Sequence, residues 1–259
     1  MHINKLLSLK GKIAVVIGGA GKIGFPMAEA LAEAGALVYI ASSHEDGYEE
    51  AVKKLLDAGL QARGIRLDMS DEKSVLQALE MIKKNSKIPD VLINAGCNRP
   101  MRKFMEDSVE NWDLSMSVNA RGIFVTCRAF ANAMVGQGSG SIINISSIYG
   151  LVAPDMNIYE GSDFETEPDY PFIKGGVIMF SKYLASYYAN RGVRVNCIAP
   201  GGFFNNQPEP FLTKYTDKVP LGRMARHDDM KGAALFLASK ASEYITGHVL
   251  PVDGGWTIT

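Results

Sequence analysis

A regular alternation of short apolar runs and amphipathic stretches constrains the fold of this chain more than any other feature. The first apolar run, KIAVVIGG at 12–19, is β-branched and closed by glycines, as expected of a strand buried on both faces. The next stretch, 22–36, carries Ile23, Met27 and Leu31 at helical spacing. Strands that alternate with helices lie parallel, because each helix returns the chain to the same edge of the sheet.

The same alternation continues to the carboxyl terminus and predicts an α/β fold. We expect strands at 12–19, 37–41, 61–68, 90–96, 140–147, 193–200 and 248–255. We expect helices at 22–36, 45–59, 70–85, 108–135, 171–190 and 228–238, with Ser70 as the N-cap of the third. No internal repeat or linker divides the chain. The sequence therefore predicts one domain over 1–259, a Rossmann-type doubly wound seven-stranded parallel sheet with helices on both faces.

The charge and cysteine content disfavour several classes of protein. With 27 Lys and Arg against 28 Asp and Glu, the net charge is −1, so no broad field attracts nucleic acid or an anionic membrane. The three cysteines and four histidines are scattered, without the spacing of a disulfide framework or a metal site. No run approaches the roughly 18 apolar residues that span a bilayer. We therefore expect no metal, no nucleic-acid or membrane partner, and a cytoplasmic location.

A glycine-rich turn, GGAGKIG at 18–24, joins the first expected strand to the first helix. Glycines in such a turn let backbone N–H groups approach a phosphate, and the helix N-terminus adds partial positive charge. Gly18, Gly21 and Gly24, with Lys22 and Ile23 between them, are therefore predicted to bind a dinucleotide. The alternative is a glycine-rich turn without a ligand, which its position at the start of an alternating chain disfavours.

The ends of later strands supply the other expected cofactor contacts. An acidic residue at the end of the second strand would hold the ribose of NAD, but Ser42 and Ser43 stand there instead. Because their hydroxyl groups can donate to a 2′-phosphate, we predict NADP or NAD, with NADP slightly favoured. The alternative is that the two serines only begin a turn. Further contacts are expected from Asp68, Met69, Asn94, Ala95 and Gly96.

Tyr170 and Lys174 in YPFIK lie one helical turn apart, a spacing too common to be informative alone. Their context makes them informative. In order along the chain stand GGAGKIG, NAG at 94–96, VN at 118–119, ISSIYG at 145–150, YPFIK, NCIAPGG at 196–202 and ITGHVLPVDGG at 245–255. With these motifs, over nearly its whole length, the chain resembles the short-chain dehydrogenase/reductase family in its short, single-domain branch.

The resemblance implies a nicotinamide cofactor and carbonyl or alcohol chemistry, with Tyr170 as the acid/base and Lys174 as its partner, both also beside the cofactor. A free tyrosine has a pKa of about 10 and is a poor base at neutral pH. A neighbouring ammonium group and an oxidised nicotinamide would both stabilise the phenolate. Ser147 would bind the substrate and donate to the developing alkoxide, and Ser146 is a lesser candidate for that role.

The same resemblance implies further roles. Asn119 would hold a water for proton relay, and Pro200 and Gly201 would border the nicotinamide. The chain would form a homo-oligomer, either a tetramer or a dimer. One departure concerns the glycine turn, where Lys22 replaces a glycine that is usual in the short branch.

The stretch between the catalytic serine and tyrosine is also a departure, because Ser147 and Tyr170 are 23 residues apart, more than is usual in the family. We therefore predict that 151–169 is an inserted acidic loop beside the active site. The segment 148–169 holds six acidic residues and no lysine or arginine. It is interpreted either as a solvated acidic loop or as a substrate lid that repels acidic carriers such as acyl carrier protein.

Two other segments bear on the substrate. NRPMRK at 98–103 brings Arg99 and two other cations to the same rim, where they could hold a carboxylate or phosphate, although a basic surface loop is an equal alternative. In GGFFNNQPEPF at 201–211, Asn205 and its amide neighbours suit a hydroxyl-rich ligand. We predict Ser147, Arg99 and Asn205 as substrate contacts and favour a polar sugar or sugar acid over a fatty acyl chain. The stretch SSIYGLVAPDMNIYEG also resembles oxidoreductases of bacterial surface-sugar and flagellin-modification pathways.

The sequence thus predicts an NAD(P)-dependent oxidoreductase that interconverts a secondary alcohol and a ketone on a polar, sugar-derived small molecule. A 3-oxoacyl-type reductase is the alternative among enzymes. A non-catalytic nucleotide-binding sensor is the alternative from another class, and the intact Ser147, Tyr170 and Lys174 argue against it. A serine hydrolase is disfavoured because the chain contains no G-x-S-x-G elbow.

Overall fold

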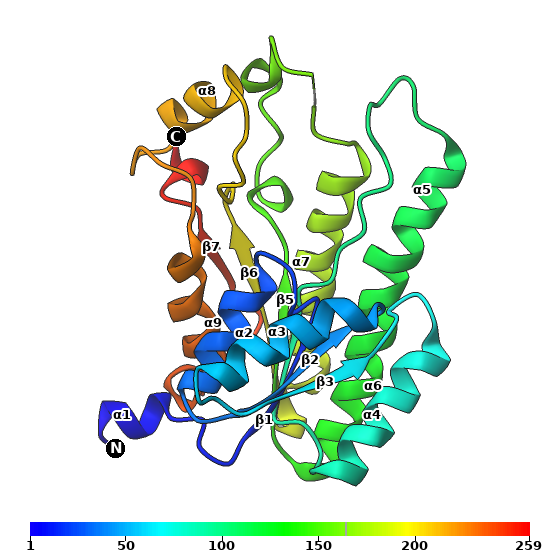
Figure 1. The fold of residues 1–259 in the computed structure, drawn as a ribbon, viewed down its shortest axis with the longest axis vertical. Coiled ribbons are helices and arrows are strands. Elements are labelled where there is room, and N and C mark those ends of the chain that lie inside the picture. Colours follow the sequence, from blue (N-terminus) through cyan, green and yellow to red (C-terminus); the bar gives the residue numbers. More distant parts are fainter. Residues whose placement is uncertain (164) are drawn as a thin grey trace.

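A parallel β-sheet forms the centre of the molecule in the computed structural model, which describes residues 1–163 and 165–259 (Figure 1). Within those residues the sheet has seven strands in the order β3-β2-β1-β4-β5-β6-β7, and every neighbouring pair is parallel. The predicted α/β fold and seven-stranded parallel sheet are therefore confirmed. The strands are β1 (Ile13–Ile17), β2 (Leu37–Ser42), β3 (Ala62–Arg66), β4 (Val91–Asn94), β5 (Gly140–Ile145), β6 (Val193–Pro200) and β7 (Val249–Val252).

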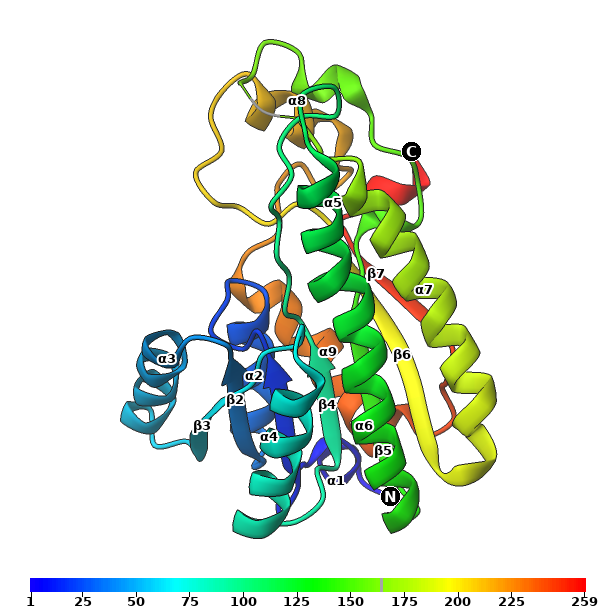
Figure 2. The ribbon, with the colours of Figure 1, turned by 90° about the vertical axis from the view of Figure 1, so that its right-hand side faces the viewer.

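Helices cover both faces of this sheet, as the alternation predicts (Figures 1 and 2). β1 contributes side chains to the apolar core on both faces of the sheet, because successive side chains of a strand point to opposite faces. Val15 packs in the buried cluster on one face and Val16 in the cluster on the other. The helix layer on the Val15 face contains α4 (Glu72–Asn85), α6 (Gly122–Gln137) and α7 (Asp169–Tyr188), and the layer on the Val16 face contains α2 (Gly24–Glu33), α3 (Glu45–Asp57) and α9 (Lys231–Ala238).

None of the described helices is long and apolar enough to cross a membrane.

The helix expected at 108–135 is interrupted. α5 (Val109–Met116) and α6 are joined by a π-helical turn, Ser117–Arg121. The backbone stays helical through this turn, so the expectation of one long helix did not reveal the interruption. Such turns occur often at functional sites, and this one contains Asn119.

The expected N-cap of α4 is wrong by one residue. Asp71 caps the helix, since its carboxylate accepts from the backbone N–H of Lys73 at 3.0 Å. The Ser70 hydroxyl instead donates to the carboxylate of Asp68 at 2.7 Å. Two short helices, α1 (Ile3–Leu7) and α8 (Phe211–Lys218), also lie where the alternation predicts none.

The carboxyl edge of the sheet carries the main candidate cavity. Strand order reverses between β1 and β4, and the crevice outside such a reversal is where ligands bind in doubly wound sheets. Above this edge lie α8 and the segment 148–160 (Figures 1 and 2). Ile158 of this segment and Phe211 of α8 belong to one small apolar cluster, together with Trp256 near the carboxyl terminus. A cavity of about 540 Å³ lies between this cover and the strand ends.

Candidate active site

Two glycines of the turn after β1 are packed too tightly to accept a side chain. A Cβ added to Gly18 would lie 2.6 Å from the backbone nitrogen of Gly96, and one added to Gly24 would lie 2.2 Å from the carbonyl oxygen of Gly18. Gly18 also has a φ of +73°, which other residues rarely adopt. The start of α2 is thereby brought against the end of β4, where backbone N–H groups and the helix dipole favour an anionic pyrophosphate. This cradle fits a dinucleotide, and Lys22 and Ile23 extend from it into the cavity wall.

Two other cofactor candidates lie near the ends of β2 and β3. Ser42 ends β2, and its hydroxyl accepts from the backbone N–H of His44 at 3.3 Å. Ser43 follows and is half-buried. Asp68 lies just after β3 and accepts from the backbone N–H of Ser70 at 2.8 Å as well as from its hydroxyl. One Asp68 carboxylate oxygen is therefore already engaged by its own turn.

Two predicted cofactor residues direct their side chains into the protein. Met69 is 5% exposed, and a Cβ on Gly96 would lie 2.7 Å from its sulfur. Asn94 is 1% exposed, and its amide donates to Asn144 Oδ1 at 2.7 Å. For Met69 and Asn94, any contact with a dinucleotide would therefore come from the backbone. Ala95 and Gly96 follow Asn94 directly, and the Ala95 N–H donates to the carbonyl of Ile17, the last residue of β1, at 2.9 Å.

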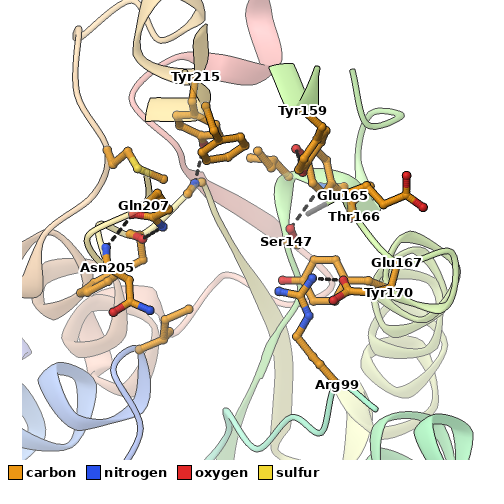
Figure 3. Close-up of a pocket in the computed structure, with 18 of the residues that line it drawn as sticks. Arg99, Ser147, Tyr159, Glu165, Thr166, Glu167, Tyr170, Asn205, Gln207 and Tyr215 are labelled. Atoms are coloured by element: carbon orange, nitrogen blue, oxygen red, sulfur yellow. Dashed lines mark hydrogen bonds and ion pairs between the residues drawn. The ribbon is translucent and has the colours of Figure 1, made fainter. Parts of the chain in front are cut away.

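Two of the four predicted catalytic residues line the cavity, and a third lies close to one of them. Ser147 follows β5 and Tyr170 lies in the first turn of α7, and both line the cavity (Figure 3). Lys174, one turn further along, is buried, with its ammonium 5.4 Å from the centroid of the Tyr170 ring. Lys174 also donates to the carbonyl of Ile145 at 2.9 Å, which fixes its position. The Ser146 hydroxyl instead donates to the backbone carbonyl of Lys174 at 2.8 Å, which argues for a structural role.

Asn119 is held rigidly beside these residues. Its side-chain oxygen accepts from the backbone N–H of Asn98 at 2.9 Å, and its amide donates to the Asn98 carbonyl at 2.5 Å and to Ser115 Oγ at 3.0 Å. The Ser115 hydroxyl donates to the carboxylate of Asp169, the residue before Tyr170. Asn119, Ser115 and Asp169 are all buried. This chain of hydrogen bonds ties the π-helical turn to the start of α7, and no motif in the sequence indicated it.

Arg99 lines the cavity, and its charge is paired with a carboxylate. Its guanidinium carbon lies 4.4 Å from the centroid of the Tyr170 ring, and its Nη2 pairs with Glu167 (Figure 3). Burial lowers the pKa of Arg99, but the charge and hydrogen bond of Glu167, together with the nearby Tyr170 phenol, outweigh burial and hold the pKa above its ordinary value. Sequence reasoning did not single out Glu167, although its position three residues before Tyr170 was a usable signal.

The carboxylates of the acidic segment, 151–169, mostly hold structure together. Asp155 pairs with Lys218, and Glu160 lies 3.6 Å from Lys214, so two ion pairs join this segment to α8. The Glu165 carboxylate accepts a hydrogen bond from the backbone N–H of Phe104, in the loop after β4, at 3.0 Å. Neither sequence interpretation accounts for these contacts, because both treat the charges as facing solvent or a carrier. Asp155 and Glu160 instead pair with cations, and Glu165 with a backbone N–H, on segments that only the fold brings near.

Aromatic side chains that the sequence analysis did not select form another wall of the cavity. Tyr149, Tyr159, Phe211 and Tyr215 line it, and the hydroxyls of Tyr149 and Tyr159 lie 2.8 Å apart. Burial raises the pKa of Tyr215 to about 12 and raises those of Tyr149 and Tyr159 as well. These phenols therefore stay protonated at neutral pH. Their positions follow no sequence period, so only the fold gathers them.

The end of β6 closes the site. Gly201 follows Pro200 and donates to the carbonyl of Val252 at 3.0 Å, and it lines the cavity together with Asn205. The amide of Gln207 folds back on its own loop, donating to Phe203 and accepting from the Asn205 N–H (Figure 3). Among the described residues, no three His, Cys, Asp or Glu side chains gather as a metal site would require.

Comparisons with known proteins agree with this arrangement. A family model described as Enoyl-(Acyl carrier protein) reductase matches residues 18–257. The 2,5-dichloro-2,5-cyclohexadiene-1,4-diol dehydrogenase of Sphingobium indicum is 36% identical over 255 residues, covering 96% of this chain and 98% of that protein. The 3-oxoacyl-(acyl-carrier-protein) reductase of Chlamydia muridarum is 37% identical over 254 residues, covering 95% and 98%. A crystal structure of a gluconate 5-dehydrogenase from Burkholderia cenocepacia, in complex with NADP and tartrate, has a TM-score of 0.91 and 29% identity, with 100% of both chains covered.

Proposed function

Because the chain belongs to the short-chain dehydrogenase/reductase family and is an NAD(P)-dependent oxidoreductase, we propose that it interconverts a secondary alcohol and a ketone on a polar, sugar-derived small molecule. One observation carries the proposal: Ser147, Tyr170 and Arg99 line the same cavity, with the Lys174 ammonium close to the Tyr170 ring. When bound, the cofactor accepts or supplies the hydride.

The residues of the chain would handle the proton and the substrate oxygen. Tyr170 would exchange the proton of the alcohol at its phenol oxygen, with the charge of Lys174 stabilising the phenolate. Ser147 would donate to the oxygen on which negative charge develops. Asn119 would position a water through which the proton is passed to solvent.

The cofactor is NADP or NAD, and we propose that its phosphates bind the glycine cradle of Gly18, Gly21 and Gly24. Ser42 and Ser43 would donate to the 2′-phosphate, which favours NADP slightly. The Burkholderia structure with NADP supports this preference.

Polar groups and flat aromatic walls support a sugar or a sugar acid as the substrate. A cavity of about 540 Å³ suits a small molecule rather than a long acyl chain. Arg99 and Asn205 lie in its wall, and aromatic rings can pack against the C–H faces of a sugar. Tartrate, which is bound in the crystal structure of the Burkholderia enzyme, is itself a hydroxylated acid.

A 3-oxoacyl-type reductase remains the second candidate. Arg102 and Lys103 are exposed at the cavity mouth, where they could bind the phosphate of a carrier-bound thioester. The similarity to the Chlamydia reductase also favours this alternative.

A substrate panel separates the two candidates. Sugars, sugar acids and acyl thioesters would be tested with both nicotinamide cofactors, in each redox state, by absorbance. We expect turnover with a polyhydroxylated substrate and little with the thioesters. Tyr170→Phe should lose turnover while binding the cofactor nearly as well as the wild type. Turnover of only the thioesters would select the second candidate, and full activity of Tyr170→Phe would remove Tyr170 as the acid/base.

We also propose that the chain forms a homo-oligomer. α5 and α6 run end to end on one face, and α7 lies beside them (Figure 2). Tyr183 and Tyr187 on α7 stay 60% and 47% exposed, and Phe124 on α6 is 44% exposed. Such an apolar face suits a second copy of the chain.

We propose a cytoplasmic location as well. All three cysteines are free thiols, as is usual for proteins of a reducing compartment.

A further inference from the structure

Two cations from different parts of the chain lie close to the Tyr170 ring. Lys174, from α7 itself, places its ammonium 5.4 Å from the ring centroid. Arg99, from the loop after β4, places its guanidinium carbon 4.4 Å from the same centroid. Both separations lie within the range of about 6 Å in which a cation is attracted by an aromatic ring.

Glu167 determines where this second cation lies. Its carboxylate pairs with Arg99 Nη2, and its backbone carbonyl accepts from the Tyr170 N–H at 3.3 Å. The Glu167 side chain is 11% exposed, so its charge is poorly screened, whereas the Arg99 side chain is 48% exposed. A single residue therefore contacts both the cation and the backbone of the tyrosine.

We propose that Arg99 is a second cation acting on the Tyr170 phenolate, and that Glu167 is the positioning residue that holds Arg99 over the ring and moderates its charge. This inference rests on the proposed role of Tyr170 as the acid/base. It assigns a task in catalysis to the acidic segment, through the ion pair at Glu167.

Other charged or titratable groups surround the same ring, and they must be held constant in any test. Tyr149 approaches it edge-on, with centroids 6.5 Å apart and planes at 89°. Tyr215 lies across the cavity on α8. Asp169 precedes Tyr170 and is bonded to Ser115. The groups facing Tyr170 are therefore Lys174, Asp169, Glu167, Arg99, Tyr149 and Tyr215.

Opposite charges on Arg99 and Glu167 predict opposite effects on the ionisation of the phenol. Without the positive charge of Arg99, the phenolate is less stable and should form at a higher pH. Glu167→Gln keeps an oxygen to accept from Arg99 but removes the negative charge, so the phenolate should form at a lower pH. Arg99→Lys keeps the charge and should stay near the wild type.

A spectroscopic titration measures this without a substrate. The ultraviolet absorbance of tyrosinate is titrated in each variant, and the same variant carrying Tyr170→Phe is subtracted to isolate one phenol. Relative to the wild type, Arg99→Gln should raise the midpoint by about half a pH unit or more, and Glu167→Gln should lower it. Circular dichroism at each pH verifies that the variants remain folded.

A similar ion pair elsewhere in the chain provides the control. Arg128 pairs with Glu72 and lies 4.7 Å over the ring of Phe124, which cannot ionise. Arg128→Gln removes the same charge and should leave the Tyr170 midpoint unchanged.

The proposal is overturned if Arg99→Gln behaves like Arg128→Gln, or if the Arg99 and Glu167 variants shift the midpoint in the same direction. Because the titration needs no turnover, a substrate panel without activity would count against the proposed function and not against this inference.

Discussion

Replacement of Gly24 by alanine tests whether the close packing of the glycine turn is needed for the dinucleotide. The new Cβ would lie 2.2 Å from the Gly18 carbonyl oxygen and 2.8 Å from its carbonyl carbon. Real Cβ atoms essentially never come within 3.0 Å of a heavy atom outside their own residue and its chain neighbours. The turn or the start of α2 would therefore have to move by about 0.8 Å, and both atoms that block the methyl group belong to the backbone.

The expected magnitude follows from two opposing effects. Overpacking costs about 1–3 kcal/mol of unfolding free energy, whereas alanine is favoured over glycine inside a helix by up to about 1 kcal/mol. We expect a net loss of about 1–2 kcal/mol. The displaced N–H groups would also misalign with an anionic phosphate, and the loss of one charge-assisted hydrogen bond, about 1.5–3 kcal/mol, weakens binding about 10- to 100-fold.

The assay combines urea unfolding with a fluorescence titration of NADPH. Gly232→Ala in α9 is the matched control, because no atom lies within 4 Å of its added Cβ and the position is also helical. The control should bind the cofactor as the wild type does and be equally or slightly more stable. Wild-type affinity and stability in Gly24→Ala would refute the argument from close packing.

Three other substitutions test separate parts of the structure. Ser115→Ala should lower the free energy of unfolding in urea by about 1–3 kcal/mol and should also lower turnover, because it removes the hydrogen-bond donor to the buried Asp169 carboxylate. Unchanged stability and turnover would show that this hydrogen-bond chain is dispensable. The hydrogen bonds of Arg223 lower the pKa of Asp229 to about 2, so Asp229→Asn should lower the melting temperature at neutral pH, and the difference should vanish as pH falls from about 4 to about 2. A difference that persists at pH 2 would contradict this sign. Tyr183→Glu should reduce the mass seen by light scattering, whereas Tyr244→Glu, at a fully exposed site, should not; an unchanged mass in the first variant would remove α7 from the interface.

Local patterns in the sequence were sufficient to predict the architecture. A strand buried on both faces reads as one apolar run, as β1 does, and each glycine turn or helix marks where a run ends. The alternation of such runs with helices leaves a parallel sheet as the arrangement that buries them all. Ser147, Tyr170 and Lys174 were also predicted, because the motifs that contain them resemble those of the family, and their role in proton transfer stays a prediction.

The sequence alone determined the sheet and the glycine turn, because both depend on residues close together along the chain, whereas the candidates for proton transfer came from its resemblance to the family. Only the tertiary structure decided the surroundings of Tyr170. It brought Arg99 across the ring from 71 positions away, paired it with Glu167, and turned Asn94 and Met69 inward. Those outcomes depend on which loops meet at the carboxyl edge, and a charge or an aromatic ring carries no local signal of the partner that the fold will bring to it.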